Sequence, residues 1–409
     1  MRITWLGIAA LLAAGSIPAA ASTPSSGGIR AVASSASAGI RVLRTRQPVR
    51  HIAADGSRVA VATTTDKQSI CDRIVVWSPT KRSSVSFKTG VCNDVSTIDD
   101  IWGLALAGKT ALWLEAGGGN WIELGVFSHT LGSKKTKLVS PSASYSLSAY
   151  ESYNYGPYSF LGNLFGAGNL LVFNSWTACM EVPVGWEGAT CPQSASGGDP
   201  VMLYSNQKLF KVAKGKGVEI ASAPNTQIGV TGIVSVGSDR DAVAVAPAVV
   251  AVDAKRITAQ NPDGSVTIYS AKGAVLQSIP IPSGTFSGFA LQDSQLVTIR
   301  DDKLELYNVS SGRLVKTISV AAGSRLRDLQ NGLAVYVSKL KVHVLRLSDK
   351  RGVTYSPPGK GTVDAQIEPS GLFYSYNTKS EVYLMRFPNT KSPGRVVFVP
   401  YAKVLKELG

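Results

Sequence analysis

A repeat of close to 40 residues constrains this chain more than any other sequence feature. In the second half of the chain, four segments each show an alternating strand, a turn with glycine or proline beside a basic residue, and a second strand. Val266, Leu304, Val342 and Val382 hold equivalent places, at spacings of 38, 38 and 40 residues. Another pair of short strands precedes each segment, so the repeating unit is four strands joined by tight turns.

Four short strands in about 40 residues are the period of one β-propeller blade. One small sheet cannot cover both of its own faces, whereas sheets arranged radially pack on their neighbours. The first half follows the same plan, with Ile74, Ile122 and Leu209 at equivalent places and spacings to the next unit of 48, 87 and 57 residues. The sequence therefore predicts an all-β fold, a single β-propeller of four-stranded antiparallel blades over residues 40–400. Seven blades are expected, and six or eight are compatible with the strand-like residues 229–248.

The hairpin "LELYNVSSGRLVKTI" at residues 304–318 is the clearest copy of the repeat. In its shape the chain resembles secreted bacterial β-propellers of the broad WD-repeat, quinoprotein and TolB-like kind, over most of its length after residue 40. The Gly-His and Trp-Asp pairs of true WD repeats are missing, and so is a repeated tryptophan docking motif. The resemblance therefore implies the fold and carries over no functional residue. An array of β-sandwiches is the rival fold, which the regular four-strand period disfavours.

The two ends of the chain differ from the repeat. Residues 1–21 combine one arginine, a short apolar run and small residues before Ala21, the pattern of a secretory signal peptide cut after Ala21. An uncleaved anchor is the alternative, although the apolar run is short for a membrane span. Residues 22–39 read as a Ser/Ala/Gly-rich tether, and residues 401–409 as a tail compatible with a helix. Residues 40–46 would add a strand to the last blade, in competition with residues 395–399.

The cysteine count is even, and an exported chain reaches an oxidising compartment, so disulfides are expected. Cys71, Cys92, Cys179 and Cys191 allow three pairings, of which the order along the chain favours Cys71–Cys92 and Cys179–Cys191. A metal site is the weaker interpretation, because there is no C-x-x-C pair and the three histidines are isolated in the sequence. No metal and no cofactor are therefore expected. His51 alone is placed to reach the central channel, and His343 falls in an alternating strand.

The order of strands from the channel outward assigns every connection to one side of the ring. Connections between the second and third strands, and from the fourth strand to the next blade, emerge on one side, which we call the loop side. The remaining connections emerge on the opposite side, the turn side. The four long insertions, at about residues 90–100, 140–158, 175–200 and 222–246, fall on the loop side together with all four cysteines. Long irregular loops within a compact domain are usually functional or disordered.

The loop side also collects aromatic residues, which provide contact area at low entropy cost and stack on sugars and protein side chains. We expect a ligand-binding face there, braced by the disulfides. The alternatives are that the tryptophans cover a small core of their own insertion and that the tyrosine run is a solvated loop. The candidate ligand-binding residues are Trp121, Tyr150, Tyr153, Tyr155, Tyr158, Trp176, Trp186 and Glu187.

The net charge of +15 favours attraction to an anionic cell-envelope polymer. Binding to nucleic acid is not expected, because the chain is predicted to be exported and has no nucleic-acid motif. The basic residues fall mainly in turns and outer strands of the turn side, where protection of sheet edges is the favoured explanation. They are Lys81, Arg82, Lys134, Lys135, Lys137, Lys214, Lys216, Lys272, Arg313, Lys350, Arg351 and Lys391.

Sequence signatures of catalysis are weak. The chain has no G-x-S-x-G elbow, P-loop or dinucleotide fingerprint, and its adjacent carboxylates would point to opposite faces of a strand. The predicted function is an exported, non-enzymatic binding or scaffold protein, secreted or held in the cell envelope, that binds an extracellular protein or glycan. The alternative is a polysaccharide-active hydrolase or lyase with its site at the mouth of the channel.

Overall fold

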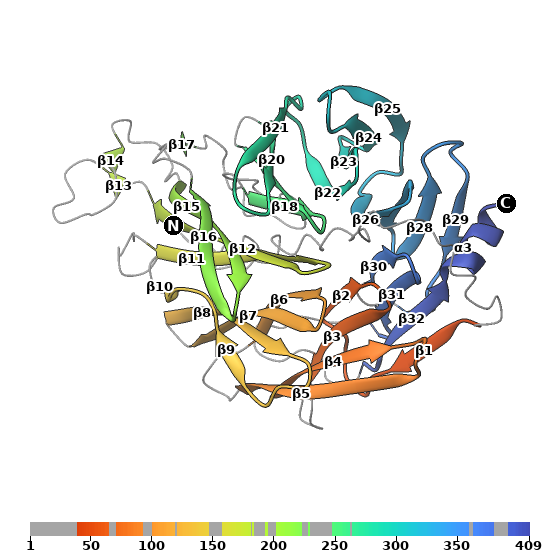
Figure 1. Ribbon diagram of the computed structural model, residues 1–409, viewed down its shortest axis with the longest axis horizontal. Helices are drawn as coiled ribbons and strands as arrows, with labels where there is room; N and C mark the ends of the chain where they lie inside the picture. Colours follow the sequence, from red (N-terminus) through yellow and green to blue (C-terminus); the bar gives the residue numbers. More distant parts are fainter. Residues whose placement is uncertain are drawn as a thin grey trace, which may run out of the picture.

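Seven antiparallel sheets, each of four strands or of four with a short fifth, stand around a common centre (Figure 1). The chain is therefore a seven-bladed β-propeller, which confirms the predicted fold class and blade number and excludes the sandwich array. The computed structural model describes residues 39–64, 71–92, 100–118, 121–146, 158–180, 182–183, 193–194, 202–222, 228–229, 248–261, 264–359, 363–379 and 392–409.

Blades 4, 5 and 6 are the regular copies. Val266, Leu304 and Val342 lie on their third strands and are fully buried, so the 38-residue period reports the same core position in consecutive blades. Blade 4 is β18 (Ala248–Val252), β19 (Arg256–Gln260), β20 (Val266–Ser270) and β21 (Val275–Ile279); blade 5 is β22 (Phe286–Gln292), β23 (Gln295–Arg300), β24 (Lys303–Asn308) and β25 (Leu314–Ser319); blade 6 is β26 (Arg325–Gln330), β27 (Leu333–Ser338), β28 (Lys341–Arg346) and β29 (Gly352–Tyr355).

Blades 1, 2 and 3 have longer strands, and the outer edge of blades 2 and 3 is made in two pieces. In blade 2, β9 pairs with one half of β8 and β10 with the other; in blade 3, β16 and β17 divide β15 in the same way. Blade 1 is β2 (His51–Asp55), β3 (Arg58–Thr64), β4 (Cys71–Ser78) and β5 (Ser83–Cys92); blade 2 is β6 (Asp100–Ala107), β7 (Thr110–Gly118), β8 (Trp121–Thr130), β9 (Thr136–Leu138) and β10 (Ala143–Ser146); blade 3 is β11 (Tyr158–Ala167), β12 (Leu170–Met180), β15 (Met202–Ala213), β16 (Lys216–Ser222) and β17 (Ile228–Gly229), with β13 (Val182–Pro183) and β14 (Gln193–Ser194) as a separate parallel pair.

Blade 7 closes the ring by taking strands from both ends of the described chain. Its order is β30 (Val363–Glu368), β31 (Gly371–Asn377), β32 (Gly394–Pro400) and then β1 (Arg41–Arg44), which pairs antiparallel with β32. Residues 395–399 and 41–44 therefore do not compete, because they form the third and the outer strand. The expected final hairpin with Val382 on the third strand was wrong in this respect, and Val382 itself lies outside the described residues.

The burial patterns explain why β32 and β1 take these places. Val396, Val397, Phe398 and Val399 are all 4% exposed or less, as suits a strand covered on both faces. In β1, half-buried and exposed residues alternate, as suits an outer strand with one face in water. After β32 the chain forms helix α3 (Tyr401–Leu408), whose Val404 and Leu408 are one helical turn apart and pack into the core shared by blades 6 and 7.

Side chains on the inner strands of blades 1, 5, 6 and 7 hydrogen-bond these blades to a following one. In each case a carboxylate or amide oxygen accepts a backbone N–H from the inner strand of another blade or from the turn after it, which gives that donor a partner. The bonds are Gly108 N to Asp55 Oδ2 (2.7 Å), Gly168 N to Asp55 Oδ1 (2.9 Å), Gly56 N to Glu368 Oε2 (3.0 Å), Ile367 N to Asp328 Oδ2 (2.8 Å) and Asn331 N to Gln292 Oε1.

Gln330 of blade 6 stands at the place of Gln292 in blade 5 but breaks this pattern. The amide of Gln330 is fully buried, and neither its oxygen nor its nitrogen has a hydrogen-bond partner in the described part of the chain. The donor expected by analogy is the residue after Glu368, and that residue is Pro369, which has no N–H. The proline therefore accounts for the oxygen of Gln330, which has no donor there.

Candidate functional site

The loop side is where blades 1 to 3 exceed the minimal repeat. Residues 65–70, 119–120 and 181–201 join second to third strands, and residues 93–99 and 147–157 lead into the next blade, so the strand ends that flank them all lie on the loop side. In blade 1, Cys71 and Cys92 are direct register partners on β4 and β5. This places their backbones side by side, as the predicted pairing requires, and the disulfide itself stays a prediction.

In blade 3 the loop-side connection starts from the tip of an extended ribbon. Strands β12 and β15 remain paired as far as Met180 and Met202, and Cys179 is the register partner of Leu203. In Figure 1 the short strands β13 and β14 lie at the periphery, beyond the end of this ribbon. Cys191 lies outside the described residues, so the predicted Cys179–Cys191 bridge stays a prediction.

The structure places three of the eight predicted ligand-binding residues. Trp121 and Tyr158 are the first residues of β8 and β11, and Trp121 is the register partner of Ser146, so both lie at loop-side strand ends. Tyr150, Tyr153, Tyr155, Trp186 and Glu187 lie outside the described residues, and their proposed role is not tested by the structure.

Trp176 is the third placed residue, and it packs within the fold. Its ring stacks on Phe160 with the centroids 5.7 Å apart and an interplanar angle of 11°, against the cluster between blades 2 and 3. A Cβ on Gly162 would lie 2.8 Å from the Trp176 ring, so the glycine makes room for it. Trp176 is partly exposed, and a contribution to ligand binding from its free edge stays a prediction.

At the loop-side opening of the channel, charged residues from blades 1, 2, 6 and 7 form two ion-paired groups. Arg50 pairs with Asp100 and lies 3.9 Å from Asp72, with Arg50 and Asp72 side chains only 5% and 2% exposed. Arg327 of β26 lies 3.3 Å from Asp364 of β30. Each carboxylate thus faces a guanidinium, which compensates the cost of removing the charges from water.

His51 is the first residue of the inner strand β2, near enough to both groups for Arg50, Asp364 and Arg327 to act on its charge; its role as a channel residue stays a prediction. Its Nε2–H donates to the carbonyl oxygen of Ile101 at 3.0 Å. Burial lowers the pKa of His51 to about 4, against the opposing effect of Asp364, while Arg50 and Arg327 lower it further. The imidazole is therefore neutral near pH 7, with Nδ1 as an acceptor.

His343 is a packed strand residue, as expected. Its ring stacks on Tyr336 at 4.8 Å, and its two nitrogens lie 2.9 Å from Ser338 Oγ and 3.0 Å from Thr354 Oγ1. Within the described ranges no group of three or more His, Cys, Asp or Glu side chains is placed to hold a metal ion. Within the same ranges no helix has the length and hydrophobicity to span a membrane.

No protein-family model matches the chain, and no curated protein matches it. Among solved structures, it is similar to a chain of the mitotic checkpoint complex, with 14% identity, a TM-score of 0.47, and coverage of 88% of this chain and 91% of that one. It is also similar to BamB from Moraxella catarrhalis, with 10% identity, a TM-score of 0.44, and coverage of 88% and 98%. The computationally designed protein Ika8 gives 10% identity, a TM-score of 0.44, and coverage of 87% and 98%. At this level the likeness concerns the path of the chain and says nothing about function.

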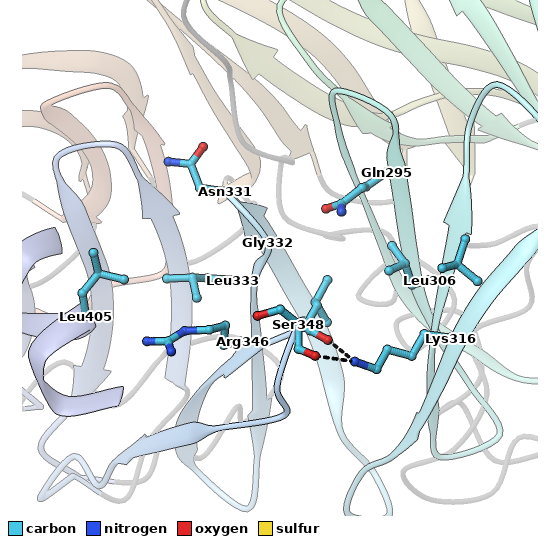
Figure 2. Close-up of a pocket in the computed structure, with 11 residues that line it drawn as sticks. Gln295, Leu306, Lys316, Asn331, Gly332, Leu333, Arg346, Ser348 and Leu405 are labelled. Carbon is cyan, nitrogen blue, oxygen red and sulfur yellow. Dashed lines mark hydrogen bonds between the residues drawn. The ribbon is translucent and has the colours of Figure 1, made fainter. Parts of the chain in front are cut away.

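The turn side carries the predicted cations and a groove that the sequence analysis missed. The described basic residues lie in turns between third and fourth strands, as with Lys81, Lys272 and Arg313, or on outer strands, as with Lys137. Lys391 lies outside the described residues. The groove, of about 390 Å³, opens between blades 5 and 6 beside helix α3 (Figure 2). In the sequence, the groove is marked by one position, Gln295. The equivalent residues of blades 1 and 4 are arginines.

The ion-paired channel opening was also missed by the sequence analysis. In the sequence, this cluster is marked by charged residues just before an inner strand or among its first residues. They are Arg50, Asp100, Arg327 and Asp364. These residues are far apart in the sequence, and only the closure of the ring brings blades 6 and 7 beside blades 1 and 2.

Proposed function

We propose that this chain is an exported, non-enzymatic binding scaffold whose loop side takes a protein or carbohydrate ligand. One observation carries the proposal: in blades 1 to 3 the sequence added to the repeat attaches at loop-side strand ends, whereas the turns between first and second strands stay short. A propeller serves in general as a rigid frame that holds variable loops in fixed relative positions. Of the predicted aromatic residues, Tyr150, Tyr153, Tyr155 and Trp186 belong to these connections, and Trp121 and Tyr158 begin the strands that follow them.

The predicted disulfides fit this role. A bridge between Cys71 and Cys92 would tie the loop-side ends of β4 and β5, and one between Cys179 and Cys191 would restrain the insertion of blade 3. Restraining a binding loop before the ligand arrives lowers the entropy cost of ordering it. The proposed ligand class is an extracellular protein or glycan, with an anionic envelope polymer as a further proposed partner of the basic turn side.

The insertion of blade 3 gives the sharpest test. Because Met180 and Met202 are register partners, an Asn-Gly turn in place of residues 181–201 would close β12 and β15 as a hairpin. Blade 7 offers a matched control on the same side: Lys379 and Ser392 are hydrogen-bonded, so Asn-Gly can replace residues 380–391, which hold no tryptophan or cysteine.

Both variants and the wild type would be compared on glycan arrays and in pull-downs from envelope extracts. We expect the blade 3 replacement to lose the captured ligand and the blade 7 replacement to keep it. Equal capture by all three proteins contradicts the role proposed for the blade 3 insertion.

Export and the disulfides have tests of their own. Mass spectrometry of protein recovered from outside the cytoplasm should show a chain that begins at Ser22, and no free thiol should react before reduction. A chain that retains Met1, or free Cys71 and Cys92 in the recovered protein, contradicts these two parts of the proposal.

The enzymatic alternative can be tested at the channel opening, where Asp72, Asp100 and Asp364 lie. A polysaccharide hydrolase or lyase working at this place would release reducing ends or unsaturated sugars from a polysaccharide panel. Its activity would be lost in the Asp364→Asn variant, whereas a binding scaffold releases no product.

A further inference from the structure

The groove between blades 5 and 6 lies where blade 5 lacks a cross-blade contact that blades 1 and 4 make. The first residue of the second strand is Arg58 in blade 1 and Arg256 in blade 4. Arg58 donates to the carbonyl of Gly108, and Arg256 to that of Asp293, each in the first turn of the next blade. In blade 5 the same place is taken by Gln295, which is shorter and lines the groove together with Asn331 of the next blade.

The floor of the groove is apolar and buried, and its walls are apolar and exposed. Leu306, Leu333 and Leu347 are 7%, 2% and 3% exposed, whereas Val315 and Leu405 are 60% and 39% exposed. In Figure 2, Leu405 of helix α3 lies on one side of the groove, and Lys316 of β25, the strand that also holds Val315, lies on the other. A volume of about 390 Å³ lies within the range of ligand sites, about 300–1,000 Å³.

The polar groups of the groove are cationic or neutral. Lys316 Nζ donates to the carbonyls of Ser348 (3.0 Å) and Leu347, and it has no carboxylate partner among the described residues (Figure 2). Arg346 also lines the groove and pairs with Asp349 at 3.0 Å. None of the described residues that line the groove is acidic.

The outer strand β25 lies beside the groove. It is the edge of the blade 5 sheet, and it exposes Leu314 and Val315 to 50% and 60%. An edge strand presents unpaired N–H and C=O groups to an added chain. The amides of Gln295 and Asn331 provide further donors and acceptors at the groove.

We propose that this groove is a docking site for an acidic peptide segment of a partner protein that inserts an aliphatic side chain. The buried leucines would receive the aliphatic anchor, Lys316 and Arg346 would face the carboxylates, and the edge of β25 with the two amides would bind the peptide backbone. The site lies on the turn side and is independent of the proposed loop-side ligand, so either can fail without the other. A fatty acid shares the carboxylate and the aliphatic chain but has no backbone amides, and it is the competing outcome.

The test uses full-length protein and fluorescence polarisation with pools of short labelled peptides. One pool combines Asp or Glu with Leu, Ile or Val; the second replaces the acids by Lys, and the third replaces the aliphatic residues by Ser. Gln295→Arg would close the groove with the contact that blades 1 and 4 already use, so the fold tolerates the side chain elsewhere in the ring. Gln295→Ala leaves the groove open and is the matched control.

We expect only the acidic–aliphatic pool to bind. Gln295→Arg and Val315→Asp should each weaken binding by about tenfold or more, since each removes the anchor's site or its apolar wall. Gln295→Ala should stay within about threefold of wild type, the scale of one modest contact. No binding by any pool, equal binding by all pools, an unchanged Gln295→Arg variant, or binding of laurate in place of the peptides would overturn the proposal.

Discussion

Blades 2 and 3 have longer first, second and third strands than blades 5 and 6, and the added length lies at the loop-side ends. Strands β11, β12 and β15 have 10, 11 and 12 residues, whereas β22, β23 and β24 have 7, 6 and 6. The turns that link first and second strands are equally short in both pairs of blades. These turns supply the N–H groups that hydrogen-bond one blade to another, so lengthening them would break the ring. The added length is found on the loop side instead.

The largest effect is expected for a substitution that breaks the hydrogen bonds between blades 1, 2 and 3. Asp55→Ala removes the acceptor for both Gly108 N and Gly168 N and should lower the free energy of unfolding by about 2–4 kcal/mol. Asp55→Asn keeps one acceptor oxygen and should fall between that variant and wild type. Chemical denaturation measures both, and a loss below about 1 kcal/mol for Asp55→Ala would show that these bonds do not hold blades 1 to 3 together.

His51 makes the start of the ring sensitive to acid. Its pKa is about 4 in the folded chain and 6.5 when unfolded, so the unfolded chain binds the extra proton first. The full stability should be present above pH 6.5 and fall by about 2–3 kcal/mol as the pH drops toward 4. His51→Gln keeps a donor for Ile101 and should flatten this part of the profile. An unchanged slope in the variant would assign the acid sensitivity to other groups.

Gln292 and Gln330 occupy the same place in consecutive blades and allow a matched comparison. Gln292→Leu leaves Asn331 N without its acceptor and should cost about 1–3 kcal/mol. Gln330→Leu removes an amide that has no partner in the described chain and should cost less than about 0.5 kcal/mol or stabilise the fold. Equal losses in thermal unfolding would contradict the role assigned to Pro369.

The smallest effect is expected for a substitution that copies a contact from one blade junction to another. Gln295→Arg should add the cross-blade hydrogen bond made by Arg58 and Arg256, and stabilise the chain by about 0.5–1.5 kcal/mol. Gln295→Lys adds a similar cation without the planar fork and should gain less. If both variants destabilise the protein equally, the groove is not an open version of the neighbouring junctions.

The sequence predicts the fold well because buried positions such as Val266, Leu304 and Val342 recur at the blade period and each blade obeys the same packing rule. The strand ends that flank the predicted insertions lie on the loop side, because strand order alone decides that. Ring closure was harder to predict. The strand-like residues around Val382 imitate the repeat, whereas the choice of Val396–Val399 for the third strand depends on burial on both faces.

The candidate sites were less predictable, for a different reason. The channel cluster joins Arg50 to Asp100 and Arg327 to Asp364, and these pairs meet only when seven inner strands share one axis. Trp176 could equally have faced solvent, and its position depends on Gly162, which leaves space for the ring on the neighbouring strand. The groove is lined by Gln295, which stands where blades 1 and 4 have Arg58 and Arg256, and nothing in the repeat pattern distinguishes that position.

The central claim is that ligand binding belongs to the loop side. Hydrogen exchange of the full chain, with and without the ligand recovered by the wild-type protein, tests it most directly. The account predicts slower exchange at the loop-side strand ends of blades 1 to 3, above all where β12 and β15 pair from Thr177 to Met180 and from Met202 to Ser205. Protection confined to the turn-side ends of the strands would contradict it.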